Sequence, residues 1–510
     1  MISEVKSIAL SGIDGYIVDV EVDIANGLPA FDIVGLPDAA VKESKERIRA
    51  AVKNSKMTVP SKRITVNLAP ADMKKEGAHL DLPIALGILA ASEQIKKDVF
   101  RDSAFLGELS LNGELRRISG VLPMVISAYQ NGIKRIFVPK DNVKEAAVVS
   151  GIDVFGVESL AELAQFFVGQ AELEPQRLSM EDLFGLSERY KYDFADVKGQ
   201  LYVKRALEIA AAGGHNMLMI GPPGSGKTMI AQRIPSILPD MSFEESLEVT
   251  KVHSIAGTLS ENSPIVTERP FRHPHHTISS IGLSGGGTYP KPGEISLSHN
   301  GVLFLDELPE FRRDALEVMR QPLEDGEITI TRVGGTFTYP CRVMLVASMN
   351  PCPCGYYGDP VRECTCSQTQ IAKYVNKISG PLLDRIDLHI EVPSVKYEEL
   401  ETKSKGESSA SIKARVDKAR KIQTERYKDS GIYSNSQLTP ELMNTYCTPS
   451  AEANELLKNA YESMGLSARA HNRILKVART IADLAGCEEI EIEHIAEAIQ
   501  YRALDKKFFN

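Results

Sequence analysis

The chain has 510 residues, of which 43% are hydrophobic and 25% charged, as is typical of folded globular proteins. At about 100–200 residues per domain, this length predicts about three domains. The formal net charge of -9 argues against a broadly basic nucleic-acid-binding surface, although a few well-placed lysines or arginines suffice for a local contact with phosphates.

Membrane insertion and export are not expected. No run reaches the roughly 18 apolar residues that span a bilayer. The first residues, Met1-Ile-Ser-Glu-Val-Lys, lack the basic and apolar segments of a signal peptide. We therefore expect a cytoplasmic protein without a membrane partner.

The first region, residues 1–168, alternates strand-like and helix-like segments. Residues 16–24 and 63–68 alternate apolar and polar side chains, which is typical of half-buried strands. Residues 82–91 predict a buried helix, and residues 135–139 predict another strand. The region is predicted to be an α/β or α+β domain.

The rest of the chain divides into three further parts. Residues 169–192 are polar with weak periodicity, which is typical of a linker. A second α/β domain is predicted over residues 193–395. A polar loop over residues 397–410 opens the last domain, residues 396–510, which is predicted to be helical from Ile412 onward.

A phosphate-binding loop is predicted directly after the short apolar strand 217–220. The sequence fits G-x-x-x-x-G-K-[ST] between a strand and a helix, where backbone N–H groups and the helix N-terminus surround phosphates. A simple glycine-rich turn is the alternative. The motif comprises Gly221, Pro222, Pro223, Gly224, Ser225, Gly226, Lys227 and Thr228. Lys227 is expected to reach the β/γ phosphates of ATP, and Thr228 is expected to ligate Mg²⁺.

Two later strands end in polar residues suited to the same site. Residues 302–305 precede Asp306, a candidate Mg²⁺ ligand, and Glu307, a candidate base for the attacking water; two acids capping a core strand are the alternative. The strand 342–349 precedes Asn350, whose amide is suited to hold the water or the γ-phosphate. Arg385 follows and suits a trans-acting arginine, with a surface salt bridge as the alternative.

Several segments resemble one family. Residues 271–279, 285–287, 292–301 and 305–311 are similar to the magnesium-chelatase-like branch of AAA+ ATPases, and the whole chain closely resembles the ComM/YifB family. The resemblance implies Walker A at 221–228, Walker B at Asp306 and Glu307, sensor 1 at Asn350 and an arginine finger at Arg385. It also implies a sensor 2 arginine, for which Arg469 is favoured and Arg473 is the alternative, and a hexameric ring with ATP between subunits.

The resemblance also implies a Lon-protease-like first domain of the ribosomal S5 domain 2 type. Lon proteases need a serine nucleophile that is activated by a lysine. Here His79 stands where the serine is expected, and Leu122 stands near the lysine position. We therefore expect no proteolysis, and a scaffold or docking role instead.

A compact cysteine cluster follows Asn350. Cys352, Cys354, Cys364 and Cys366 have the spacing C-x-C, nine residues, C-x-C, and four thiolates can enclose a structural Zn²⁺. Reducible disulfides and free thiols remain alternatives. The other cysteines, Cys341, Cys447 and Cys487, are isolated and are expected to be packed in the core.

Three further segments suggest contacts with a macromolecule. The histidines His273, His275 and His276 lie in a Gly/Pro-rich stretch from Pro270 to Gly293, which suits a pore loop better than a metal site. Residues 329–339 predict a hairpin with Arg332 as a candidate DNA contact; a solvated edge hairpin is the alternative.

The last of these segments is basic. Residues 412–428 hold seven Lys/Arg against two acids, with Ile412, Val416 and Ala419 on one face. A solvated helix with an apolar underside is favoured there over a DNA contact.

The leading hypothesis is an ATP-driven DNA helicase or translocase, since resemblance to ComM implies branch migration of transforming DNA through a ring pore. The alternatives are the motor subunit of a magnesium chelatase and a protein-remodelling ATPase. A chelatase motor subunit lacks the Lon-like domain that precedes the motor here.

Overall fold

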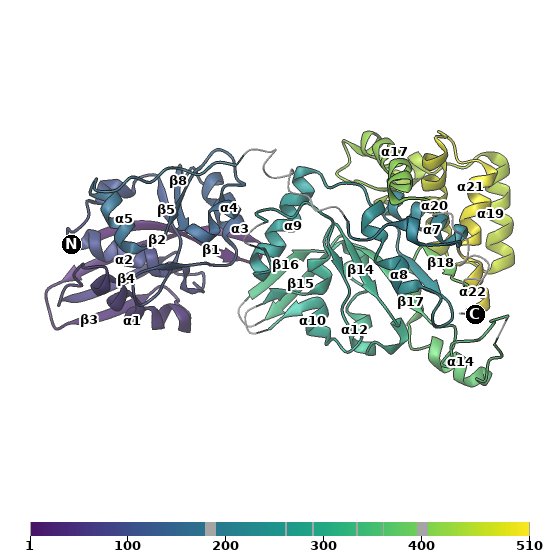
Figure 1. Cartoon of the computed structure of the whole chain (residues 1–510), viewed down its shortest axis with the longest axis horizontal. Coiled ribbons are helices and arrows are strands. Elements are labelled where there is room, and N and C mark those ends of the chain that lie inside the picture. Colours follow the sequence, from purple (N-terminus) through teal and green to yellow (C-terminus); the bar gives the residue numbers. More distant parts are fainter. Residues whose placement is uncertain are drawn as a thin grey trace.

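The protein is described by a computed structural model, which covers residues 2–178, 190–260, 263–287, 290–332, 335–360, 362–394 and 406–508. Three regions follow one another along the long axis of the molecule, from the purple N-terminal sheet to the yellow C-terminal helices (Figure 1). None of the helices within these residues is long and apolar enough to cross a membrane.

The N-terminal region is built on a seven-stranded mixed sheet of order β3-β4-β2-β1-β5-β8-β9. Its apolar helix α2 is buried along its whole length, which confirms the predicted buried helix. The elements are β1 (Ile2–Ser11), β2 (Asp14–Ala25), β3 (Ala30–Val34), α1 (Ala39–Asn54), β4 (Arg63–Ala69), α2 (Asp81–Ala91), β5 (Ser103–Phe105), β6 (Glu108–Leu109), β7 (Leu115–Arg116), α3 (Val121–Gln130), β8 (Arg135–Pro139), α4 (Val143–Ala146), β9 (Asp153–Val157) and α5 (Leu160–Phe167).

The central region is built on a five-stranded sheet of order β11-β14-β17-β10-β18, in which every pairing is parallel. The inner strands are apolar on both faces, as a sheet covered on both sides requires. The strands are β10 (Met217–Ile220), β11 (Phe271–Arg272), β14 (Val302–Leu305), β17 (Met344–Met349) and β18 (Leu388–Glu391). The helices are α7 (Leu201–Gly213), α8 (Lys227–Ala231), α9 (Phe243–Ala256), α10 (Ser280–Ser284), α11 (Glu294–Leu297), α12 (Arg313–Glu317), α13 (Pro322–Asp325), α14 (Gln368–Val375) and α15 (Gly380–Leu383).

The central region also contains two small antiparallel ribbons: β12 (Gly285–Gly286) with β13 (Lys291–Pro292), and β15 (Glu327–Arg332) with β16 (Gly335–Pro340). The second ribbon is the predicted hairpin, and its turn at 333–334 lies outside the described residues. The hydroxyl of Tyr339 donates to the carbonyl of Pro290 at 2.7 Å and so ties the two ribbons together.

The C-terminal helices share one hydrophobic core with α7 and with one face of the five-stranded sheet. The predicted apolar face of Ile412, Val416 and Ala419 is buried in this core. The first of these helices begins at Ser409, capped by Ser408, slightly earlier than the predicted start. The elements are α17 (Ser409–Tyr427), α18 (Pro440–Tyr446), α19 (Ala451–Met464), α20 (Ala468–Ala485), α21 (Ile492–Gln500) and α22 (Ala503–Phe508).

The N-terminal region docks on the central region through α3 and α9. Leu122 is buried in a small apolar cluster with Ile265, against which Phe243 packs. The backbone N–H of Gly120 donates to the carbonyl of Ser254 at 3.0 Å. Leu122, which stands near the position of a protease lysine, is therefore an interface residue of this domain.

The segments that were predicted to connect the domains are described only in part. The predicted linker is anchored at Gln176, whose backbone bridges Val154 in β9, while residues 179–189 lie outside the described part. Most of the predicted 397–410 loop also lies outside it. Cys487 is exposed, which corrects the expectation that it is packed, whereas Cys341 and Cys447 are buried as expected.

Candidate nucleotide site

The phosphate-binding loop joins β10 to α8 at the carboxyl edge of the sheet. Gly224 and Gly226 have φ angles of 79° and 87°, a left-handed region that favours glycine. A β-carbon at Gly221 would lie 2.2 Å from the carbonyl oxygen of Val392, so the backbones approach too closely for a side chain. The loop can therefore turn its N–H groups toward a phosphate at the start of α8.

Lys227 closes this loop on itself. Its Nζ donates to the carbonyls of Gly221 and Pro222 at 2.7 and 2.9 Å and lies 3.3 Å from Oδ1 of Asn350. Burial lowers the pKa of Lys227 to about 8, against the opposing effects of the acids Asp306 and Glu307. The structure thus brings together the predicted phosphate-binding lysine and the predicted sensor amide.

We expect MgATP to bind more weakly as the pH rises through about 8. Above this pH the Lys227 amine is neutral in the empty site, whereas phosphate oxygens favour the charged form, so binding must take up a proton. The affinity should fall by about tenfold per pH unit over this range. Calorimetry at pH 8.5 in two buffers of different ionisation enthalpy should detect the uptake.

The control for this experiment is Lys227→Arg, because a guanidinium stays charged and needs no proton. Equal heats of ATP binding in both buffers for the wild-type protein would contradict a neutral Lys227.

The two predicted Mg²⁺ ligands touch each other. Thr228 Oγ1 donates to Asp306 Oδ2 at 2.6 Å. The hydroxyl of Ser348 and the backbone N–H of Glu307, at 3.1 Å, both donate to the other oxygen, Asp306 Oδ1. One hydroxyl and one carboxylate at the sheet edge match the oxygen ligands that Mg²⁺ prefers. Ser348 was missed by sequence reasoning; its only signal is a hydroxyl inside the apolar run of β17.

Glu307 is held in a left-handed conformation, with φ 56° and a side chain that is 55% exposed. Its Oε2 lies 3.5 Å from Nδ1 of His276. The ring of His273 packs on Phe304 of β14 with centroids 4.8 Å apart. The histidine segment therefore starts beside β14, the strand that precedes Asp306, a placement that the sequence did not predict. Its role as a pore loop stays a prediction.

Arg385 lies at the other end of the sheet. It precedes β18, and its backbone carbonyl accepts a hydrogen bond from Asn216 at 2.9 Å, just before β10. The phosphate-binding loop follows β10, so a strand of roughly 13 Å separates the two. The Arg385 guanidinium pairs with Glu324 and donates to the Pro381 carbonyl at 2.7 Å.

Two further arginines, Arg469 and Arg473, lie near Arg385 at this end of the sheet. Arg473 forms a buried ion pair with Asp387, and Arg469, 57% exposed, lies 3.9 Å from Glu324, the partner of Arg385. Burial raises the pKa of Asp387, but Arg473 and His215 outweigh it and hold this pKa well below its usual value. Arg385, Arg469 and Arg473 line a cavity of about 610 Å³ between the sheet and the C-terminal helices. Arg473 is thus occupied by a structural partner, which leaves Arg469 with the more available guanidinium.

Arg473→Ala is expected to lower the free energy of unfolding by about 3 kcal/mol, because it leaves the buried Asp387 charge without its main partner. Arg469→Ala should leave the unfolding free energy nearly unchanged, since its pair is exposed. Urea denaturation of both variants checks this. Equal stability losses would contradict the division of roles between the two arginines.

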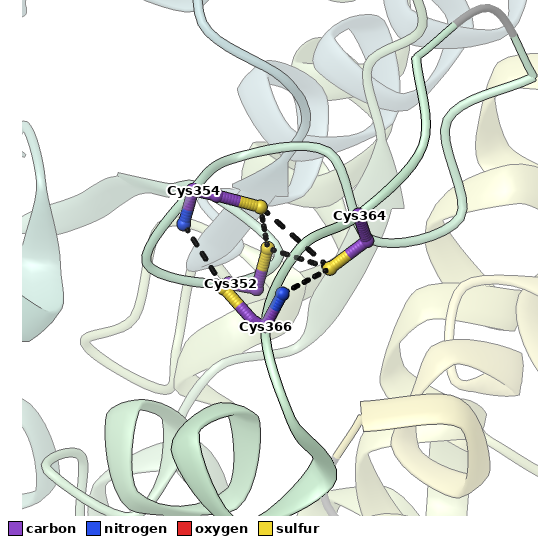
Figure 2. A group of neighbouring side chains, drawn as sticks. All are labelled: Cys352, Cys354, Cys364 and Cys366. Carbon is purple, nitrogen blue, oxygen red and sulfur yellow. Dashed lines mark hydrogen bonds between the residues drawn. The ribbon is translucent and has the colours of Figure 1, made fainter.

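The four clustered cysteines converge from two limbs of the loop between β17 and α14 (Figure 2). The Sγ atom of Cys352 lies 3.3 Å from that of Cys354 and 3.7 Å from that of Cys364, and all four sulfurs are within 4.8 Å of one another. A tetrahedral zinc site with bonds of about 2.3 Å places sulfurs about 3.8 Å apart. All four cysteines are free, so the geometry fits a metal better than disulfides.

Family models match three parts of the chain. Residues 193–400 match "Magnesium chelatase, subunit ChlI", residues 20–142 match "Subunit ChlI of Mg-chelatase", and residues 406–502 match "Magnesium chelatase, subunit ChlI C-terminal".

Curated relatives cover nearly the whole chain. Competence protein ComM of Haemophilus influenzae is 45% identical over 502 residues, which is 98% of this chain and 97% of that protein. Uncharacterized protein YifB of Escherichia coli is 44% identical over 506 residues, 99% of this chain and 98% of that protein. A Lon protease of Acinetobacter baumannii is 26% identical over 174 residues, 32% of this chain and 21% of that protein.

Proposed function

Because this chain belongs to the ComM/YifB family of magnesium-chelatase-like AAA+ ATPases, we propose that it is a cytoplasmic DNA translocase or helicase that promotes branch migration. The observation that carries the proposal is the 45% identity, over 98% of the chain, to a relative named as a competence protein. The contacts of Lys227 with Asn350 and of Thr228 with Asp306 support the proposal that ATP hydrolysis drives this movement.

In the proposed ATP site, each residue has one task. The Nζ atom of Lys227 leaves the loop carbonyls to which it donates and binds the β/γ phosphates instead. Asn350 orients the water or the γ-phosphate. Glu307 accepts the proton of the attacking water. Thr228 and Asp306 would hold Mg²⁺, which neutralises developing phosphate charge when it is bound.

The proposed assembly is a homohexameric ring with ATP at each interface. Arg385 supports this arrangement because it lies about a strand length from its own phosphate-binding loop, and so must act on a neighbour's ATP. Its Nε is, among the described residues, a buried donor without an acceptor. Arg469, beside it, is the proposed sensor 2 residue.

The proposed DNA contact in the ring pore is the β15–β16 hairpin. Arg332 stands at the last described position of β15, at the hairpin tip, with an exposed side chain. An exposed guanidinium at this place suits contact with a phosphate backbone. The N-terminal region is proposed to be a docking scaffold.

The test is ATPase activity of the full chain with and without a branched DNA, followed by strand exchange on a four-way junction. ATP-dependent movement of the branch supports the proposal. Absence of DNA stimulation together with absence of DNA binding at low salt would overturn it.

A magnesium chelatase motor is the second candidate, because the matching family descriptions name subunit ChlI. ATPase activity that responds to a porphyrin-binding partner and not to DNA would favour this candidate. Capture of protein clients by an ATP-bound, hydrolysis-deficient chain would favour a remodelling ATPase.

The cysteine cluster is proposed to bind one structural Zn²⁺. We expect mass spectrometry of the purified protein to find about one zinc per chain, because four convergent thiolates form a closed tetrahedral site. Cys364→Ser should lose the metal, whereas the exposed Cys487→Ser should retain it. A wild-type protein purified with zinc present but containing none would contradict the proposal.

A further inference from the structure

The cysteine cluster is in direct contact with the phosphate-binding loop. A β-carbon placed on Gly355, between the two cysteine pairs, would lie 2.5 Å from Cδ and 2.8 Å from Cγ of Pro223. Gly355 therefore packs its backbone against the Pro223 ring. Its φ angle of 88° is left-handed, so the turn at this position favours glycine. The segment that carries the cysteines thus packs against Pro223 of the predicted phosphate-binding loop.

A second connection runs through the backbone at Asn350. The backbone N–H of Gly221 donates to the carbonyl of Met349 at 3.2 Å, so the first residue of the loop is hydrogen-bonded to the last residue of β17. Asn350 follows, with its amide oxygen 3.3 Å from Lys227 Nζ. Cys352, only two residues later, is fully buried in the core cluster that contains Met349. Asn350 thus lies two residues before the first cysteine of the cluster, and Pro223 packs against Gly355, the residue that follows the second.

The segment that carries the cysteines has little structure of its own. In its described residues between Asn350 and Ser367, the chain forms neither helix nor strand. Two of its glycines, Gly355 and Gly358, are left-handed. A loop of this kind depends on cross-links for its shape. The four thiols supply them by converging on one point (Figure 2).

We infer that the metal-loaded cysteine cluster is a positioning element for the nucleotide, which holds Pro223 and Asn350 in the geometry that binds ATP. Metal occupancy is thereby coupled to nucleotide affinity, without any cysteine touching ATP. This inference rests on the proposed zinc and ATP sites, and extends them to a regulation of one by the other.

The experiment measures the zinc content and the affinity for a fluorescent N-methylanthraniloyl ATP, with Mg²⁺, on the full chain. Cys364→Ser removes a ligand on the limb away from Pro223 and should lose zinc and bind the nucleotide at least tenfold more weakly. Gly355→Ala keeps all four thiols, so it should retain zinc and still bind at least several-fold more weakly.

Two matched controls separate this coupling from general damage. Cys487→Ser removes an exposed cysteine, and Gly486→Ala places a side chain at a left-handed glycine with φ 76° and open space around it. Both should bind nucleotide as the wild-type protein does. Circular dichroism and thermal unfolding verify folding. If Cys364→Ser does not fold, zinc is removed from the wild-type chain by dialysis against a chelator, and the nucleotide affinity is measured again with Mg²⁺ restored.

Each failure has its own signature. Wild-type nucleotide affinity in folded, zinc-free Cys364→Ser or in Gly355→Ala overturns the coupling and leaves both sites standing. A wild-type protein that binds nucleotide but holds no zinc overturns the zinc site and the inference with it. A zinc-loaded wild-type protein that binds no nucleotide overturns the ATP site.

Discussion

Glu307→Gln is expected to bind ATP with near wild-type affinity but to hydrolyse it at least a hundredfold more slowly. A positioned general base contributes about 10²–10⁴ to the rate, and glutamine cannot accept the proton. Binding should survive because Glu307 contacts Asp306, Ser348 and His276 rather than Lys227 or the phosphate-binding loop. The measurements are steady-state ATPase activity and nucleotide affinity on the same preparation.

Glu310→Gln is the matched control for this variant. Glu310 lies three residues further along the chain, with Oε2 3.3 Å from Nζ of Lys377 on the surface, so its loss should leave the ATPase rate nearly unchanged. An active Glu307→Gln protein, or an equal loss of activity in both variants, would assign the base to another residue.

Arg385→Ala is expected to lower the ATPase rate by about a thousandfold, with nucleotide binding retained, because arginine fingers contribute about 10³–10⁵ to phosphoryl transfer. Because Arg385 lies about a strand length from the phosphate-binding loop of its own subunit, the loss of activity is expected to arise at the interface with a neighbouring subunit. The surface variant Arg312→Ala, which breaks an exposed pair with Asp314, should keep its activity.

Mixing Arg385→Ala with an otherwise inactive Lys227→Ala chain should restore activity. A competent interface needs the ATP site of the first variant and the arginine of the second. In a random equal mixture, each condition is met half the time, so about a quarter of interfaces should work if sites act independently. A mixture that exchanges subunits but stays inactive would show that Arg385 acts within its own subunit.

The buried strands were predictable because their signal is local. The prediction for residues 217–220 coincides with β10, and the buried run before Asp306 coincides with β14. The start of α17 was missed because two serines and an alanine, capped by Ser408, precede the first large apolar position. Terminal turns of this kind are set by capping, not by periodicity.

The candidate site residues show the same contrast between those with a local sequence signal and those without one. Thr228 and Asp306 were predicted to lie together, because two strands of a parallel sheet end at one edge, and the structure places their side-chain oxygens 2.6 Å apart. Their role as Mg²⁺ ligands stays a prediction. Ser348 was missed, and His276 was assigned to a pore loop without its place beside Glu307 being predicted, since neither residue stands in a pattern that links it to the ATP site. Both gain their place only from the pairing of β14 with β17 and of β11 with β14.

The sequence by itself determined the chemistry of the phosphate-binding loop and the four-thiol cluster, because each depends on residues a few positions apart, whose spacing dictates their geometry. Only the tertiary structure decided how these parts meet. It placed Arg385 at the far end of the sheet from Lys227, paired Arg473 with Asp387, and packed Gly355 against Pro223. Such contacts join residues tens to more than a hundred positions apart, and packing of the whole core, rather than local spacing, brings them together.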